Sequence, residues 1–233
     1  MREIVFDTET TGLDPYQGHR LIEIGCIELV NRFPTGQVFH RYVNPDRDVP
    51  EEAFAVHGLS YDFLKSHPAF SDIAGDLLDF IGNAALVAHN AMFDLGFLNA
   101  ELERSNRPGI PRDRLVDTLL LARRKFPGSS NRLDDLCVRL GIDNARRTKH
   151  GALLDAELLA EVYLELIDAR QAQLGFTVAA VSAIAARTLA NDVRTRPVAL
   201  KQRLTELERL AHRALVAELG VKAIWNEYLV AAQ

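Results

Sequence analysis

The chain has 233 residues and is 48% hydrophobic, 25% charged and 7% aromatic, a composition typical of one globular domain with an appendage and unlike a disordered or collagenous chain. No apolar run approaches the roughly 20 residues that cross a bilayer, and the first residues lack a signal-peptide pattern. The net charge is −5, but residues 1–169 carry −9 and residues 170–233 carry +4. An acidic body therefore continues into a basic tail.

The two cysteines, Cys26 and Cys137, fit no metal-binding, redox or disulfide spacing. A reducing compartment suits such cysteines. We therefore expect a cytoplasmic protein without membrane contact.

Strands dominate the start of the chain. Alternation of apolar and polar residues predicts strands at 3–7, 21–30 and 37–43, the last two joined by a turn at Pro34-Thr35-Gly36. Helical spacing then predicts helices at 71–82, 91–105, 115–125, 131–140 and 152–170, with a short buried strand at 85–88. This order predicts an α/β fold with a mixed sheet and flanking helices.

The pattern changes near residue 170. Residues 177–190 are rich in alanine and suit a helix, and residues 195–197 break that pattern. Beyond Leu200, apolar residues recur at helical spacing up to Leu215, and Gly220 is a candidate cap. A tail this short buries little core, so we expect it to dock on a partner.

Carboxylates recur at unusual places in three segments. Asp7 and Glu9 lie two apart on the first strand, so both project to one side. Asp94 follows the candidate N-cap Asn90 and lies on the apolar stripe of its helix. A solvated strand end and the edge of a stripe are the plain alternatives for these positions.

Asp155 repeats this pattern near the start of another helix, on the stripe formed by Leu158, Leu159 and Val162. His150 precedes that helix on a loop, although a lone histidine is more often structural. Three carboxylate segments together favour a site for hard cations, Mg²⁺ or Mn²⁺. Four carboxylates suit two ions for displacement at phosphorus, with a histidine to take the proton of water.

The motifs Asp7-x-Glu9, Asn90-x-x-Phe93-Asp94 and His150-x-Ala152-x-x-Asp155 resemble, in order and separation, the three motifs of the DEDDh 3′–5′ exonuclease family. The resemblance implies a ribonuclease-H-like fold and release of nucleoside 5′-monophosphates from a single-stranded 3′ end. It also implies two Mg²⁺ or Mn²⁺ ions, whose ligands would be Asp7, Glu9, Asp94 and Asp155. His150 would be the general base.

The segment Glu52-Ala53-Phe54-Ala55-Val56-His57-Gly58 is similar to one in the family of proofreading (epsilon) subunits of bacterial DNA polymerase III. That similarity implies that Glu52 and His57 lie near the bound nucleotide, together with Thr8 and the metal-binding Asp7, Glu9 and Asp155. A polar surface loop is the plain alternative for the segment. The resemblance covers residues 1–170, which we take as the exonuclease domain.

Two features of the tail extend the resemblance. Gln171, Leu174 and Phe176 have the Gln-x-x-Leu-x-Phe form of a peptide that binds a sliding clamp, within residues 171–176. The remainder, residues 177–233, resembles more loosely the segment by which epsilon subunits bind the polymerase catalytic subunit. Trp225 and Leu229 are candidate interface anchors there.

Two basic runs flank the motifs, Arg123-Arg124-Lys125 and Arg146-Arg147-Lys149. They suit contacts with DNA phosphates, or for the first run a solvated face. Phe93 and Leu13 are candidates to wedge against terminal bases, with core packing the preferred interpretation of Phe93.

The motifs therefore predict a 3′–5′ exonuclease that removes mismatched nucleotides from DNA as the proofreading subunit of a replicative polymerase. The alternatives are a DEDDh ribonuclease that trims RNA 3′ ends and a replisome scaffold that does not catalyse.

Overall fold

The computed structural model describes residues 1–145, 147, 149–169, 204–220 and 225. Contacts divide the chain into two compact units, Met1–Gln173 and Leu174–Gln233, and each is described by itself. No helix within the described ranges is long and apolar enough to cross a membrane.

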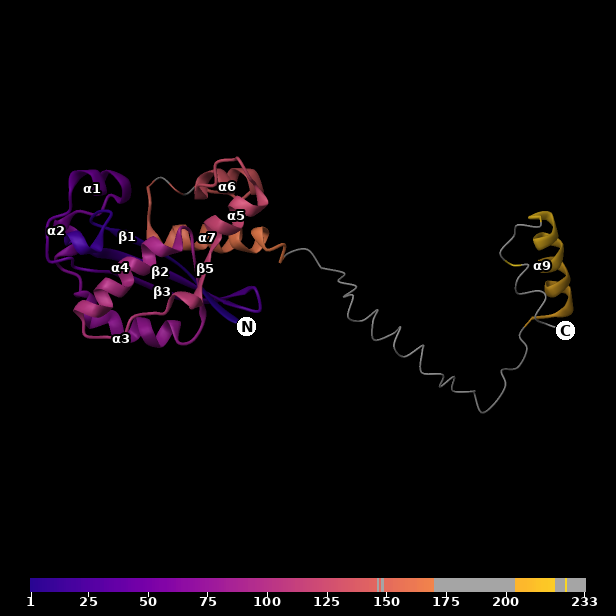
Figure 1. Ribbon diagram of the computed structural model, residues 1–233, viewed down its shortest axis with the longest axis horizontal. Coiled ribbons are helices and arrows are strands. Elements are labelled where there is room, and N and C mark those ends of the chain that lie inside the picture. The colour runs from indigo at the N-terminus through magenta and orange to yellow at the C-terminus, as the bar shows by residue number, and fades with distance from the viewer. Residues whose placement is uncertain (146, 148, 170–203, 221–224, 226–233) are drawn as a thin grey trace. The chain divides into compact units, whose positions relative to one another are not determined.

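The first unit contains a sheet with helices on both of its faces (Figure 1). Its strands are β1 (Arg2–Thr10), β2 (Leu21–Val30), β3 (Phe33–Tyr42), β4 (Ala85–Ala88) and β5 (Leu115–Asp117). Its α-helices are α1 (Glu51–His57), α2 (Tyr61–Leu64), α3 (Phe70–Ile81), α4 (Ala91–Arg104), α5 (Thr118–Lys125), α6 (Leu133–Leu140) and α7 (Ala152–Leu166), and two short 3₁₀ turns lie at Pro15–Gln17 and Arg112–Arg114.

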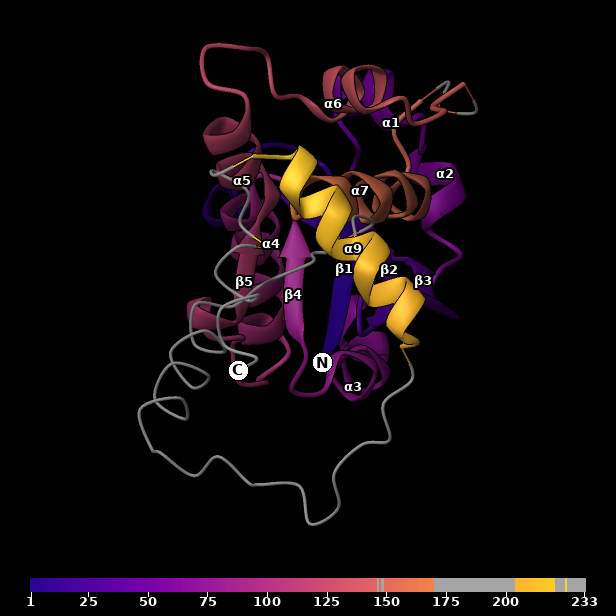
Figure 2. The ribbon, with the colours of Figure 1, turned by 90° about the vertical axis from the view of Figure 1, so that its right-hand side faces the viewer.

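The five strands are ordered β3-β2-β1-β4-β5 (Figure 2). The first three strands pair antiparallel, whereas β4 pairs parallel with β1, and β5 parallel with β4. The predicted mixed sheet flanked by helices is thereby confirmed. In open sheets, ligand sites form at the carboxyl ends of parallel strands, so we expect a site at the carboxyl ends of β1, β4 and β5.

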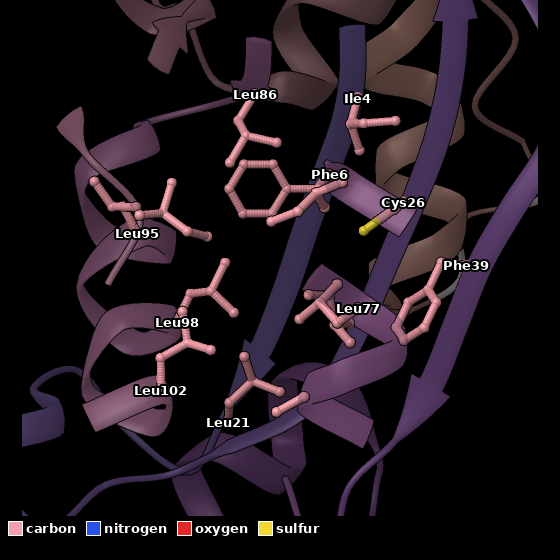
Figure 3. Close-up of a cluster of buried hydrophobic side chains, with 14 of the residues drawn as sticks. Ile4, Phe6, Leu21, Cys26, Phe39, Leu77, Leu86, Leu95, Leu98 and Leu102 are labelled. Carbon is pink, nitrogen blue, oxygen red and sulfur yellow. The ribbon is translucent and has the colours of Figure 1, made fainter. Parts of the chain in front are cut away.

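The two faces of β1 belong to different cores, as the period of two requires. Ile4 and Phe6 face α3 and α4 and share a core with Leu95, Leu98 and Leu102 of α4 (Figure 3). Val5 faces α7 with Ile27 and Leu29 of β2. A third cluster joins α5 and α6 to the far side of α7 through Ala122, Leu136, Cys137, Leu158 and Val162.

Two predicted boundaries are wrong. The turn between β2 and β3 is Asn31-Arg32 rather than Pro34-Thr35-Gly36, and both residues have positive φ, 52° and 72°. Two such residues suit a tight hairpin whose twist matches the strands. The predicted turn lies instead at a register shift, where Ile27 pairs with Val38 and Leu29 with Pro34.

The helix predicted over 115–125 is in fact strand β5 followed by α5. The side chain of Asp117 accepts a hydrogen bond of 2.9 Å from the backbone N–H of Leu119. Asp117 is therefore the N-cap, and the helix begins at Thr118. Three residues of strand are too short to alternate visibly. The segment with Glu52 and His57 is helix α1 rather than a loop.

In the second unit, the predicted helix is α9 (Glu206–Glu218). A capping box starts it, since Thr205 Oγ1 accepts from Glu208 N at 3.3 Å and Glu208 Oε2 accepts from Thr205 N at 2.8 Å. Gly220 has a φ of 81° just beyond its end. The predictions for residues 177–190 and 195–197 lie outside the described residues.

Candidate active site

The ends of the three parallel strands carry polar groups at one edge of the sheet. Asp7 and Glu9 lie in the last part of β1, His89 and Asn90 follow β4, and Asp117 ends β5. Backbone N–H of Asn90 donates to Asp117 Oδ1 at 3.2 Å. This edge is where the topology places a site.

The helices α4 and α7 bring the other two predicted carboxylates to the same edge. Asp94 lies in the first turn of α4 and is 3% exposed, and Asp155 lies in the first turn of α7 and is 2% exposed. Asp7, Glu9, Asp94, Asp155 and His150 line one cavity of about 780 Å³. The structure thus brings all five predicted residues together.

The side chain of Thr8 holds Asp94 in place. Thr8 lies on the face of β1 opposite to its neighbours Asp7 and Glu9, and its Oγ1 donates to Asp94 Oδ1 at 2.6 Å. Asn90 occupies the N-cap position of α4, as predicted, but with a φ of 63° and without a side-chain cap. The hydrogen bond from Thr8 to Asp94 therefore fixes the first turn of α4 to strand β1.

Burial and mutual repulsion make the cluster electrostatically costly. Burial raises the pKa of Glu9 to about 8, with the nearby Asp155 adding to the shift. Burial likewise raises the pKa of Asp94 to about 7. The pKa of Asp7 lies well above its usual value because of burial and then of the Asp94 charge. Cations at this edge relieve that repulsion.

Asp155 is the exception, because a cation already contacts it. Arg147 Nε donates to Asp155 Oδ1 and Arg147 Nη2 to Asp155 Oδ2, both at 2.6 Å. His150 Nδ1 lies 3.1 Å from Asp155 Oδ2. Burial raises the pKa of Asp155, yet hydrogen bonds from Arg147 and His150 outweigh it and leave that pKa lowered.

The donor set fits divalent cations. Among the described residues, ligand atoms of Glu9, His150 and Asp155 lie within 4.8 Å of one another, and Asp7 and Asp94 add further carboxylate oxygens to the same cavity. Oxygen-rich sites of this kind suit Mg²⁺ or Mn²⁺ rather than structural zinc. The raised pKa values of Glu9 and Asp94 are the mark of carboxylates that lack a compensating charge.

A second cavity of about 660 Å³ lies beside the first and shares its lining residues Thr8, Glu9 and Phe93. Glu52 and His57, both on α1, line this second cavity. His57 is 5% exposed, and its Nδ1 accepts from Leu59 N at 3.0 Å. Its Nε2 therefore carries the proton, and that buried atom has no partner in the described part of the chain.

Phe93 and Leu13 also border the second cavity. Phe93 is partly buried: its ring packs against the buried Phe97, with ring centroids 5.1 Å apart, and it also lines both cavities. Leu13 is 84% exposed at the rim. An exposed leucine on a loop beside a cavity is available to touch a ligand.

Arg147 and His89 have roles that the sequence did not reveal. The side chain of Arg147 is only 7% exposed and also contacts Asp134 Oδ2 at 2.6 Å, so it belongs to the site rather than to a free basic run. His89 Nδ1 lies 2.9 Å from Thr118 Oγ1, and its Nε2 lies 2.8 Å from the Asn131 carbonyl.

Several predicted residues lie outside the described residues, namely Arg146, Gln171, Leu174, Phe176 and Leu229. Trp225 is described and is 50% exposed. The predicted clamp peptide and most of the tail therefore stay predictions.

A family model described as Exonuclease matches residues 4–163 of the chain. The DNA polymerase III subunit epsilon of Rickettsia conorii (strain ATCC VR-613 / Malish 7) is 48% identical over 214 residues, which are 90% of this chain and 93% of that protein. The subunit of the same name from Escherichia coli (strain K12) is 50% identical over 173 residues, 71% of each protein.

Solved structures share the fold at lower identity. Exonuclease X in complex with 5′ overhanging duplex DNA has a TM-score of 0.54 and 23% identity, over 72% of this chain and 92% of that chain. The nuclease domain of 3′hExo, a DEDDh family member bound to rAMP, has a TM-score of 0.61 and 19% identity over the same shares. The predicted ribonuclease-H-like fold is thereby confirmed. The chain belongs to the exonuclease family, as a DEDDh 3′–5′ DNA exonuclease of the kind that forms the proofreading epsilon subunit of DNA polymerase III.

Proposed function

We propose that the chain hydrolyses the last phosphodiester bond of a DNA 3′ end with two divalent cations held by Asp7, Glu9, Asp94 and Asp155. The observation that carries this proposal is the convergence of these four carboxylates, from one strand and two helices, on one cavity. When bound, the ions supply Lewis-acid polarisation of the phosphate and a lowered pKa of water.

His150 is the proposed general base. Its Nδ1 lies 3.1 Å from Asp155 Oδ2, which orients the ring, and its side chain is 47% exposed, so that water reaches it. The oxygen of an attacking water bonds to phosphorus, His150 takes the proton of that water, and the bond from phosphorus to O3′ of the preceding nucleotide breaks. O3′ gains a proton, and a nucleoside 5′-monophosphate leaves.

The second cavity is the proposed site of the terminal nucleoside. The protonated, unpartnered Nε2 of His57 is a donor for an oxygen of the ligand. Glu52 and the loop through Leu13 line the same cavity, and apolar walls suit a base without selecting one. Asp7, Thr8, Glu9 and Asp155 lie beside the scissile phosphate in this arrangement, with the Thr8 hydroxyl engaged by Asp94.

Selection of mismatched ends follows from the need for a single strand. A mismatched terminal nucleotide costs less to unpair than a matched one, so it enters the site more often. Proofreading then needs little recognition of base identity. The epsilon relatives support this role for the chain.

The tail is the proposed tether to partners. Residues 171–176 bind a sliding clamp through Gln171, Leu174 and Phe176, and residues 177–233 bind the polymerase catalytic subunit. Helix α9 and the residues directly flanking it leave five leucines exposed, which supports a docking surface; they are Leu204, Leu207, Leu210, Leu215 and Leu219.

Substitution of the carboxylates tests this function. Asp7→Asn and Asp155→Asn, each removing a ligand charge without changing size, are expected to abolish Mn²⁺-dependent release of nucleotides from a single-stranded DNA oligonucleotide. Asp76→Asn, at an exposed position of α3, is the matched control and should retain full activity. Retained hydrolysis by folded Asp7→Asn or Asp155→Asn protein would refute the ligand assignment.

A further inference from the structure

The larger cavity extends beyond the carboxylates toward α5 and the loop that precedes α6. Ser129, Asn131, Leu119 and Leu133 line this part, which we call the α5–α6 cleft. Two arginines also line it, Arg123 from the last turn of α5 and Arg132 from the N-cap position of α6. The proposed hydrolysis assigns no role to this end of the cavity.

The basic run 123–125 divides into three different environments. Arg123 lines the cleft. Lys125 instead points to α7, where its Nζ contacts Asp168 Oδ1 at 2.6 Å and donates to the Glu165 carbonyl at 2.7 Å. Arg124 is exposed and lines none of the cavities described above. Adjacent residues of equal charge therefore differ in whether they face the cleft.

The two arginines of the cleft are free to bind an anion. Within the described ranges, neither Arg123 nor Arg132 forms an ion pair, whereas Arg147, deeper in the cavity, contacts both Asp155 and Asp134. An exposed guanidinium beside a cavity is suited to bidentate contact with phosphate oxygens. The free arginines thus add positive charge at the end of the cavity away from the acidic cluster.

The walls of the cleft are held in place before any ligand arrives. His89 lies 2.9 Å from the hydroxyl of Thr118, the first residue of α5, and 2.8 Å from the carbonyl of Asn131, next to Arg132. Asn131 also donates to the Ser129 carbonyl at 2.8 Å. The half-buried imidazole of His89 therefore connects both segments that carry the arginines to the end of β4.

A phosphodiester at the carboxylates has a nucleotide on each side, and the two adjacent cavities have different linings. The cavity with His57 suits a nucleoside, whereas the α5–α6 cleft offers unpaired arginines. We propose that the α5–α6 cleft binds the DNA strand on the 5′ side of the scissile phosphate, with Arg123 and Arg132 contacting backbone phosphates. This proposal rests on the proposed hydrolysis and adds a path for the strand.

The test compares substrates with and without that strand in the full chain. Ten linked deoxythymidines have nucleotides 5′ to the scissile phosphate, whereas the 5′-p-nitrophenyl ester of thymidine monophosphate has none. Arg123→Gln and Arg132→Gln should each raise KM for the oligonucleotide about tenfold. Each should also reduce the slope of the logarithm of oligonucleotide affinity against the logarithm of salt concentration by about one. Hydrolysis of the ester should stay at the wild-type rate.

Arg124→Gln is the matched control and should leave both substrates unaffected. Unchanged oligonucleotide KM in both cleft variants, or an equal loss on the ester, would overturn the proposed path. Failure of the wild-type chain on both substrates would instead refute the proposed hydrolysis. Fluorescence anisotropy of the labelled oligonucleotide then still tests the cleft, because it measures binding without turnover. Arg123→Gln should bind the oligonucleotide more weakly than Arg124→Gln does.

Discussion

At the scale of single residues, the site is a set of acids held close together against their own repulsion. Glu9, Asp94 and Asp7 have raised pKa values mainly because they are buried, and the charges of neighbouring carboxylates add to the shift. Asp155 differs through its contact with Arg147. The same geometry that makes the cluster unstable without ions makes it a strong binder of cations.

This electrostatic strain predicts how stability depends on pH. Between the ordinary pKa of Glu9, 4.5, and its value of about 8 in the folded protein, the folded state binds a proton that the unfolded state has lost. Stability therefore falls as pH rises, by at most ~1.4 kcal/mol per pH unit for one such group. Melting temperature without metal should be lower at pH 8 than at pH 6.

Cations should remove that dependence, because they replace the protons and bind the folded state alone. Thermal melts at pH 6 and pH 8, with EDTA and with Mn²⁺, measure both effects. Glu9→Gln should weaken the slope in EDTA. An equal slope with and without Mn²⁺, or no change in Glu9→Gln, contradicts the prediction.

At the scale of elements, the approach of α7 to the sheet brings the third motif to the first. Gly25 pairs with Asp7 across β1 and β2, and an added Cβ there would lie 2.4 Å from Leu153 N in the first turn of α7. A side chain at this position would push away the helix that carries Asp155. Gly25 thus sets the distance between two carboxylate segments.

Gly25→Ala is therefore expected to cost about 2 kcal/mol or more of unfolding free energy, since the clash is with backbone, and to lower exonuclease activity in the folded fraction. Gly96→Ala is the control, because Gly96 lies in α4 with open space around it. That change should be neutral or stabilise by up to ~1 kcal/mol. Urea unfolding measures both variants. Equal stability of the two would show that the close approach is unimportant.

The sequence predicted most helices and strands, because the spacing of apolar residues follows the buried face of each element. It also predicted that the four carboxylates meet, because the three motifs occur in the order and separation of the exonuclease family. It did not predict strand β5, since Leu115–Asp117 is too short to show alternation and depends on pairing with β4. It did not predict the contact of Arg147 with Asp155, and it left two interpretations of Phe93 open, core packing and contact with terminal bases. Those features depend on which segments meet, and local patterns do not encode this.

At the scale of the whole molecule, the uneven charge has a physical interpretation. Four of the acidic residues of the body form the site, and two divalent ions would offset four of its nine net negative charges. The positive charge of residues 170–233 belongs to the segment that we propose as the tether. In the function that we propose, the first unit carries the chemistry at a 3′ end and the second the attachment to partners.

The most direct test of the account is the rate at which the chain releases nucleoside 5′-monophosphate from a primer with a 3′ mismatch, beside a matched primer, in Mn²⁺. The wild-type chain should act faster on the mismatched end, because unpairing costs less there. His150→Ala should be slower on both primers by about 10²–10⁴-fold. Equal rates on the two primers, or a wild-type rate in His150→Ala at neutral pH, would contradict the account.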